Sequence, residues 1–193
     1  MAIHKPVTQQ GIYFITFTCH QWLPLIELIK GYDLVYNWFE VLSAKAHAVT
    51  GFVIMPNHLH MLLYYAGGFQ SLNTIVGNGK RFMAYDIIKR LELQNENILL
   101  NRLQLAVQAS DRRWGKKHEV WKDSFDVKEC RTEKFVLQKL QYIHNNPCTG
   151  KWKLAESPEL YLHRSALFYL SGKHSYYPVK DYRVFLYPDP WDE

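Results

Sequence analysis

Residues 55–63 constrain this chain more than any other segment, because they fix both a strand and the side chains that share its faces. They read Met-Pro-Asn-His-Leu-His-Met-Leu-Leu. Pro56 and Asn57 are typical of a turn, and the alternating residues after them are typical of a β-strand. Successive side chains of a strand point to opposite faces, so His58 and His60 share one face of the predicted sheet. Two imidazoles on one face can chelate a metal ion.

The histidine pair fits two interpretations, a metal site or two histidines held by hydrogen bonds inside the protein. The turn favours the metal site, because it keeps the start of the strand near the sheet edge, where solvent and ligand can reach. A metal needs further ligands, which water, substrate oxygens, or an amide or carboxylate elsewhere in the chain would supply.

The hydrophobic pattern of the rest of the chain predicts an α+β fold. The expected strands are 12–19, 47–54 and 58–65, with one or two short strands within 119–131. The expected helices are 25–45, 72–105 with an interruption near 95–97, and a last helix that begins after an N-cap at Thr132 and runs to Pro147. This order predicts a ferredoxin-like antiparallel sheet with helices packed on it.

Length and composition indicate one main domain. The chain has 193 residues, of which 48% are hydrophobic, enough for one well-buried core. We assign residues 1–150 to this domain and residues 151–193 to a C-terminal extension that wraps the core or contributes to a binding surface. The extension is rich in proline and aromatic residues, among them Trp152, Tyr161, Tyr169, Tyr176, Tyr177, Tyr182, Pro188, Pro190 and Trp191.

Charge and cysteine content bear on partners and compartment. A net charge of +5 favours polyanionic partners, although such an excess also occurs in basic proteins that bind no nucleic acid. Three cysteines without close spacing indicate neither a disulfide framework nor a zinc ribbon. No stretch approaches the roughly 18 apolar residues of a membrane span, and the first residues contain no apolar signal region. We therefore expect a soluble, unexported, cytoplasmic protein with no membrane partner.

The last predicted helix carries a candidate nucleophile. Residues four apart lie on one face of a helix, so Gln138, Tyr142 and Asn146 would form one polar edge. Such a tyrosine fits packing alone or nucleophilic attack. Phenol is a weak nucleophile, which a nearby divalent cation helps by polarising a phosphate and stabilising the leaving oxygen. Asn146 precedes a proline, so it can equally end the helix without a chemical role.

Basic residues form a third candidate feature. The tract 112–118 is rich in arginine and lysine, and the helix before it adds further cations. These residues fit contacts to a phosphate backbone as well as a solvated loop and helix face. Trp114 and Trp121 fit base stacking on single strands, and core packing explains Trp121 equally well. The candidate DNA-binding residues are Lys80, Arg81, Arg112, Arg113, Lys116 and Lys117.

Three segments in order resemble a known family. They are 52–63, which contains the histidine pair, 120–125, which reads Val-Trp-Lys-Asp-Ser-Phe, and 142–147, which reads Tyr-Ile-His-Asn-Asn-Pro. Together they are similar to the single-tyrosine transposases of the HUH endonuclease superfamily, in particular to the REP-associated tyrosine transposases. The resemblance covers roughly residues 10–150, and the segment 163–166 is similar to a long-tailed bacterial branch.

The resemblance implies a metal-dependent enzyme of DNA transposition that nicks and joins single-stranded or hairpin DNA at the nucleoid. It implies a divalent cation, Mg or Mn, held by His58 and His60 and completed by Asn146, where many relatives carry glutamine. Tyr142 would attack the strand and leave a 5′-phosphotyrosine link and a free 3′-hydroxyl. Mg prefers oxygen ligands while paired imidazoles suit Mn, Co, Ni or Zn, so the metal stays open.

Two other functions fit the same residues. A domesticated DNA-binding protein or repressor would keep the fold and bind folded single strands without forming a covalent adduct. A metal-dependent phosphodiesterase would use water and would not need Tyr142. The sequence also leaves open whether Tyr142 works with the histidines of its own chain or with those of a second copy in a homodimer.

Overall fold

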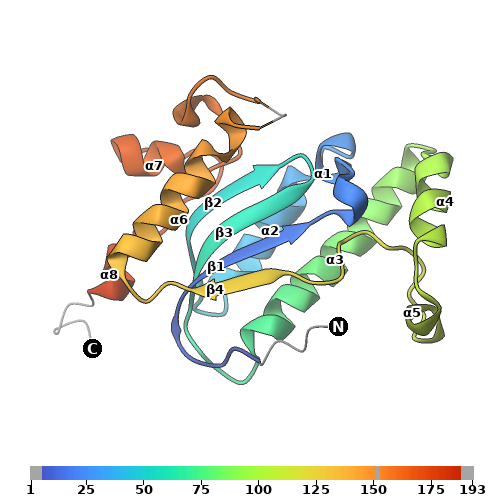
Figure 1. Ribbon diagram of the computed structural model, residues 1–193, viewed down its shortest axis with the longest axis horizontal. Coiled ribbons are helices and arrows are strands. Elements are labelled where there is room, and N and C mark those ends of the chain that lie inside the picture. The colour runs from blue at the N-terminus through green and yellow to red at the C-terminus, as the bar shows by residue number, and fades with distance from the viewer. Residues whose placement is uncertain (1–5, 151–152, 188–193) are drawn as a thin grey trace.

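The fold is an antiparallel sheet with helices on both faces, seen in a computed structural model that describes residues 6–150 and 153–187 (Figure 1). The strands are β1 (Gly11–Thr18), β2 (Ala48–Met55), β3 (His58–Tyr65) and β4 (Asp126–Glu129), in the order β2-β3-β1-β4. β3 lies between β1 and β2 and is antiparallel to both. This is the split βαβ arrangement of ferredoxin-like folds, so the predicted fold class is confirmed.

The helices come between the strands and after them. They are α1 (Leu25–Leu28), α2 (Tyr32–Ser43), α3 (Leu72–Leu93), α4 (Asn97–Leu105), α5 (Ala109–Arg113), α6 (Glu133–Asn145), α7 (Ala166–Ser171) and α8 (Arg183–Leu186). Short 3-10 turns cover His20–Trp22, Asn146–Cys148 and Pro158–Leu160. In the part of the chain that the structure describes, no helix is both long enough and apolar enough to cross a membrane.

The two faces of the sheet carry different cores. Phe17, Leu59 and Met61 pack with α2 and α3 in the larger core on one face. Phe14 and Leu62 point to the other face and pack with the buried side of α6. The alternation predicted for residues 58–63 therefore holds, and it puts the histidine pair on the α6 face.

The predicted single helix 25–45 is wrong, because the chain breaks into α1 and α2. Lys30 has a positive φ of 50°, and a Cβ on Gly31 would lie 2.6 Å from the Ile29 side chain. α1 is held separately, since the backbone N–H groups of Ile26 and Glu27 donate to the Pro56 carbonyl of the β2–β3 turn. The predicted loop 112–118 also changes, because its first two residues end α5.

Residues of the C-terminal extension, the tail, form hydrogen bonds to backbone groups along the free edge of β2. The Tyr161 and Tyr169 hydroxyls donate to the carbonyls of Ile54 and Thr50 at 2.7 and 2.6 Å. Main-chain bonds from the segment 163–165 pair with the same strand. An uncovered edge strand presents unpaired backbone groups to other chains, so these contacts protect the sheet. Of the tail residues named above, Trp152, Pro188, Pro190 and Trp191 lie outside the described residues.

Candidate metal and nucleophile site

His58 and His60 lie side by side on β3, which is paired with a strand on each side. Their ring centroids are 4.6 Å apart, and both residues are buried. Thr18 and Thr16 of β1 are their partners in the strand register. Because β3 is fixed by two ladders, the pair sits on one of the most rigid elements of the fold, which suits a site that must keep its geometry.

Asn57 fixes the orientation of His58. Its amide nitrogen donates to the Trp22 carbonyl at 2.9 Å, so its amide oxygen faces the Nδ1 atom of His58 at 2.7 Å. An amide oxygen only accepts, so Nδ1 carries the proton and donates. The Nε2 atom of His58 is then left with its lone pair, which is the state that binds a metal.

His60 has partners at both ring nitrogens. Its Nδ1 atom lies 2.6 Å from the Thr16 hydroxyl, and its Nε2 atom lies 3.4 Å from the Tyr142 hydroxyl. Phe14 stacks on the ring at a centroid distance of 5.7 Å. When Nδ1–H donates to Thr16, the Nε2 atom keeps its lone pair. That lone pair faces Tyr142 and is available to a cation on the side of His58.

Burial keeps both imidazoles neutral. Loss of solvent lowers the pKa of His58 to about 4, and hydrogen bonding to Asn146 opposes this shift. Loss of solvent also lowers the pKa of His60 to about 3, with smaller contributions from His58 and from Lys139. Neutral imidazole is the form that ligates metals, so the pair is ready to bind at neutral pH.

Tyr142 lies over the histidines from α6. Its ring meets those of His60 and Phe14 edge to face, at centroid distances of 5.0 and 5.9 Å. The residue is nevertheless 49% exposed and lines a pocket beside α6, so a ligand can reach its side chain. Both contacts come from the same chain, so one copy suffices to bring the tyrosine to the histidines.

Asn146 continues the polar edge of α6. It is the C-cap residue, with helical dihedral angles in spite of the proline after it. Gln138, Lys139, Tyr142 and Asn146 line a pocket of about 370 Å³ along this side of the helix. The predicted polar edge therefore forms, and it ends beside His58.

These residues fit a divalent cation of intermediate softness. Two imidazole nitrogens and one amide oxygen form a mixed N/O donor set, and exposed space at Tyr142 leaves room for substrate or water oxygens. Elsewhere, Asp111, Glu119 and Asp123 form a separate group, whose carboxylate oxygens lie within 4.8 Å of one another. Here the Lys116 ammonium already lies 3.2 and 2.6 Å from the first two, so a cation of the chain itself occupies this group.

The candidate DNA contacts fall into two groups. Lys80 is buried on α3, where its ammonium donates to the Lys122 carbonyl and desolvation lowers its pKa to about 8. Lys116 binds the carboxylates, and the Arg112 guanidinium binds carbonyls at the end of α4, with Val107 at 3.0 Å. These three cations have internal partners that sequence did not reveal.

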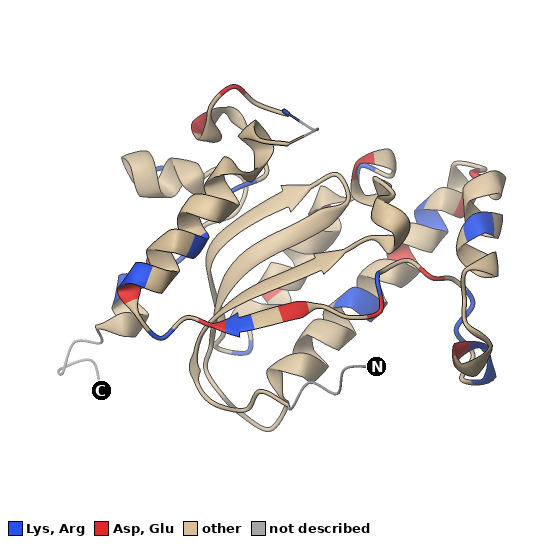
Figure 2. Ribbon diagram, in the orientation of Figure 1, with Lys and Arg blue, Asp and Glu red and all other residues tan. Residues whose placement is uncertain are grey.

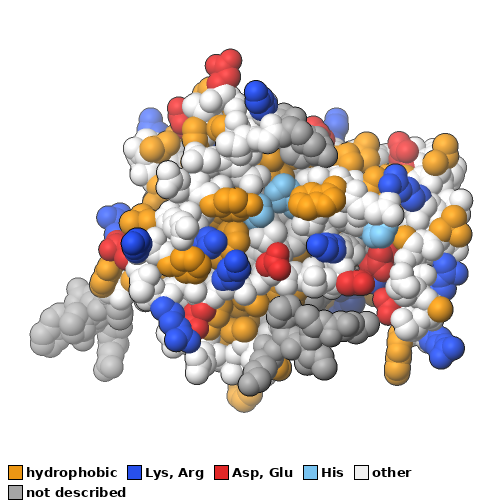
Figure 3. Space-filling view, viewed as in Figure 1, with side chains coloured by type: hydrophobic (Ala, Val, Ile, Leu, Met, Phe, Trp, Pro, Cys, Tyr) orange, Lys and Arg blue, Asp and Glu red, His pale blue; other side chains and the backbone are white. Residues whose placement is uncertain are grey.

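Arg81, Arg112, Arg113 and Lys117 are the exposed members of the predicted set, and of these Arg112 has its guanidinium on backbone carbonyls. Figure 2 shows that Lys and Arg positions occur along α3, α4, α5 and the loop that leads to β4. In Figure 3, histidine atoms reach the surface between hydrophobic side chains, with lysine and arginine around them. Trp121 is buried and its indole N–H donates to the Lys80 carbonyl, so it packs in the core, whereas Trp114 is 92% exposed.

Comparison with known proteins shows where this architecture recurs. No protein-family model matches the chain. An uncharacterized protein of Haemophilus influenzae is 25% identical over 172 residues, covering 82% of this chain and 89% of that protein. A solved structure of a REP-associated tyrosine transposase bound to a REP hairpin matches with a TM-score of 0.61 at 15% identity, covering 92% of this chain and 89% of that one. This chain has the tyrosine transposase fold. The relationship indicated by the three sequence motifs is thus confirmed at the level of the fold.

Sequence reasoning missed the residues that support the histidine pair and Tyr142. Thr16 and Asn57 orient the two histidines, Trp22 contacts His58, and Lys139 lies close to His60. The strand register could have indicated Thr16, because it lies opposite His60 once β1 and β3 are paired. The other contacts depend on the path of the loops and on the placement of α6.

Proposed function

We propose that this protein is a metal-dependent endonuclease and strand transferase for single-stranded DNA, with Tyr142 as its nucleophile. The observation that carries the proposal is that the hydroxyl of the half-exposed Tyr142 lies 3.4 Å from His60 Nε2, beside a second neutral imidazole. A tyrosine held only for packing would not need to combine exposure with this position.

The proposed reaction is a transesterification. The Tyr142 oxygen forms a bond to the phosphorus and the bond from phosphorus to the 3′ oxygen breaks. The phenol loses its proton, and the leaving 3′ oxygen takes up one proton to become a hydroxyl. The products are a 5′-phosphotyrosine link and a free 3′-hydroxyl. One phosphate ester replaces another and none is hydrolysed. A 3′-hydroxyl of another strand can therefore attack the phosphotyrosine, reverse the step and join the DNA.

The chain's own residues position the reacting groups. When bound at His58, His60 and Asn146, a divalent cation would polarise the phosphate and stabilise the leaving oxygen. Phe14 and the anchoring of α6 hold the tyrosine ring over the histidines. Lys139 lies one turn before Tyr142 and adds a positive charge near His60, which favours an anionic phosphate at this place.

The proposed substrate is a single strand that carries a hairpin, because the solved transposase with this fold is bound to a REP hairpin. Arg81, Arg113 and Lys117 are exposed cations of the predicted set, and we propose them for phosphate contacts. The internal partners of Lys80, Arg112 and Lys116 make those three poor candidates for the same role.

Tyr142→Phe tests the proposal directly, because it removes one oxygen and keeps the ring. With end-labelled single-stranded hairpin DNA and Mn²⁺, we expect the wild type to give a covalent protein–DNA band and a 3′-hydroxyl product on a denaturing gel. We expect the variant to bind the DNA and give neither product. Tyr85→Phe is the matched control, since Tyr85 is an exposed tyrosine on α3 and should keep wild-type activity.

Two other results would contradict the proposal. Nicking by Tyr142→Phe without a covalent band would indicate attack by water and a phosphodiesterase. Tight binding without nicking by the wild type in Mn²⁺, Mg²⁺, Co²⁺ or Zn²⁺ would indicate a DNA-binding protein that has lost the reaction.

A further inference from the structure

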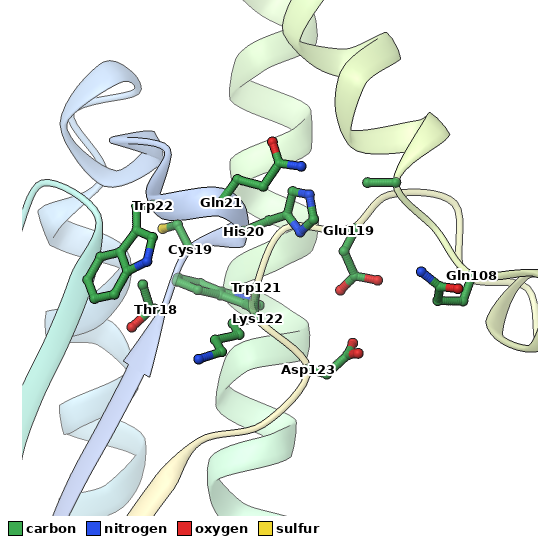
Figure 4. A pocket seen from close by; sticks show the side chains of 11 residues that line it. Thr18, Cys19, His20, Gln21, Trp22, Gln108, Glu119, Trp121, Lys122 and Asp123 are labelled. Carbon is green, nitrogen blue, oxygen red and sulfur yellow. The ribbon is translucent and has the colours of Figure 1, made fainter. Parts of the chain in front are cut away.

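A second pocket lies beside the histidine pair, on the side away from α6. It encloses about 330 Å³ at the end of β1, between the 3-10 turn His20–Trp22 and the segment before β4 (Figure 4). Trp22, Gln21, Gln108 and Glu119 are among the residues that line it. Nothing in the proposed chemistry uses this pocket, although Trp22, one of its lining residues, also contacts the His58 ring.

Trp22 is the residue that joins the pocket to the site. Its ring centroid lies 5.8 Å from that of His58, and the residue is 56% exposed. A large aromatic side chain this exposed in the wall of a pocket, rather than on a flat surface, is typical of a ligand-binding position.

The backbone holds Trp22 in an unusual conformation. Gln21 and Trp22 have φ values of 49° and 58°, two successive non-glycine residues in the left-handed region. Such conformations persist where the surroundings impose them, and they cluster at functional sites. Here the Trp22 N–H donates to the Cys19 carbonyl and the Asn57 amide donates to the Trp22 carbonyl.

Asn57 therefore links the pocket to the histidine pair. One end of its side chain binds the Trp22 carbonyl, and the other end accepts from His58. A ligand stacked on Trp22 would lie next to a group bound at His58, within the span of adjacent nucleotides.

The far side of the pocket offers polar groups. Figure 4 shows the Gln108, Glu119 and Asp123 side chains across the pocket from Trp22, with Trp121 between them. Glu119 is buried, and its carboxylate is held by Lys116 at 2.6 Å. An aromatic surface at one end and fixed amide and carboxylate groups at the other match the face and the edge of a nucleobase.

We propose that this pocket receives one unpaired base of the single strand, next to the phosphate that Tyr142 attacks, with Trp22 as its stacking surface. This inference rests on the proposed function and adds a determinant of where the strand is cut. The Glu119 carboxylate accepts hydrogen bonds, so it favours bases that present an amino donor, which are guanine, adenine and cytosine. Thymine presents one N–H between two carbonyl oxygens and should bind worst.

The test replaces each unpaired nucleotide near the cleavage site in turn by an abasic residue and measures binding of single-stranded hairpin DNA by the metal-loaded protein. For the wild type we expect one position where the loss of the base weakens binding by about 5- to 150-fold, the range expected for one base stacked on an aromatic side chain. A thymine at that position should bind more weakly than the other three bases.

Trp22→Ala should remove the effect of the abasic residue at that position, and Trp22→Phe should restore part of it. Trp114→Ala is the matched control, because Trp114 is an exposed tryptophan outside the pocket and should keep the wild-type profile. Unchanged Mn²⁺ binding and thermal unfolding would show that the Trp22 variants keep their fold and the histidine pair.

A Trp22→Ala profile identical to that of the wild type would overturn the inference. A wild type that cleaves DNA but shows no sensitive position would overturn it too, while leaving the proposed function intact. A wild type that neither binds nor cleaves single strands would instead contradict the proposed function.

Discussion

At the scale of single residues, the site depends on groups that never touch a substrate. Neutral imidazole exists in two forms, and only the partner of its other nitrogen decides which atom keeps a lone pair. The Asn57 amide oxygen does this for His58, and the Thr16 hydroxyl holds the Nδ1 side of His60 and accepts from it when Nδ1 carries the proton. Removing either partner should weaken metal binding without removing a ligand.

Thr16→Val tests this dependence, because valine keeps the shape of threonine and loses the hydroxyl. We expect Mn²⁺ affinity to fall about 10- to 100-fold, as for other variants in which the partner of a ligating histidine is removed. Thr16→Ser should restore most of the affinity, since the hydroxyl returns. Calorimetric titration with Mn²⁺ measures both, and wild-type affinity in Thr16→Val would show that the Thr16 contact does not orient His60.

The candidate ligands and nucleophile could be predicted from the sequence, whereas the residues that orient them could not. His58, His60 and Tyr142 stand out because their side-chain chemistry and spacing carry the argument. Thr16 is one of many threonines until the strand register sets it opposite His60. Lys80 looked like a surface cation because it lies on a charged helix, and only tertiary packing buries it.

At the scale of elements, two glycines allow helices to pack closely against their neighbours. A Cβ on Gly51 would lie 2.6 Å from Leu140, so β2 lets α6, and Tyr142 with it, approach the sheet closely. A Cβ on Gly79 would lie 2.3 Å from the Trp38 ring, so α3 rests against α2 in the same way. Close approaches of this kind cannot be read from hydrophobic periodicity, whereas the strands and the β2–β3 hairpin could.

Two glycines of α3 give a matched test of this packing. Gly79→Ala should destabilise the protein by about 1–3 kcal/mol, because the added methyl group overlaps the Trp38 ring and forces α3 away from α2. Gly77→Ala, two residues earlier in the same helix, should stabilise it by about 0.5–1 kcal/mol. The exposed Gly77 position has no atom within 4 Å of a new Cβ, and alanine favours the helix.

Urea denaturation of the two variants measures both free energies of unfolding. Equal effects of the same sign would show that α3 does not depend on contact between Gly79 and Trp38.

At the scale of the whole molecule, histidines that are kept neutral tie the site, α6 and the tail together. Loss of solvent lowers the pKa values of His144 and His163 to about 4, close to that of His58. His144 bonds to Ser165 of the tail, and His163 stacks on Tyr32 of α2. The same condition, a neutral imidazole, therefore holds the tail on the core and prepares the metal site.

This arrangement predicts acid-sensitive stability. The pKa of each of these histidines is lower in the folded state than the value of about 6.5 in the unfolded chain, so the unfolded state binds more protons as the pH falls. Their contribution is complete above about pH 6.5 and is lost progressively toward the folded pKa values near 4. Within that window, each histidine should lower the free energy of unfolding by about 1.4 kcal/mol for each pH unit of acidification.

Urea denaturation of the metal-free protein at pH 7.5, 6.0 and 5.0 measures this loss. The hydrogen-bonded carboxylates of Asp33 and Asp181 have pKa values lowered by Arg90 and Arg183, so they stay ionised in this range and do not contribute. His144→Gln should reduce the slope of the free energy of unfolding against pH by about the contribution of one histidine. Glutamine keeps a polar side chain but takes up no proton in this range. Stability that does not change between pH 7.5 and pH 5.0 would mean that the folded protein accepts these protons, and that the histidine pair is then not held neutral for a metal.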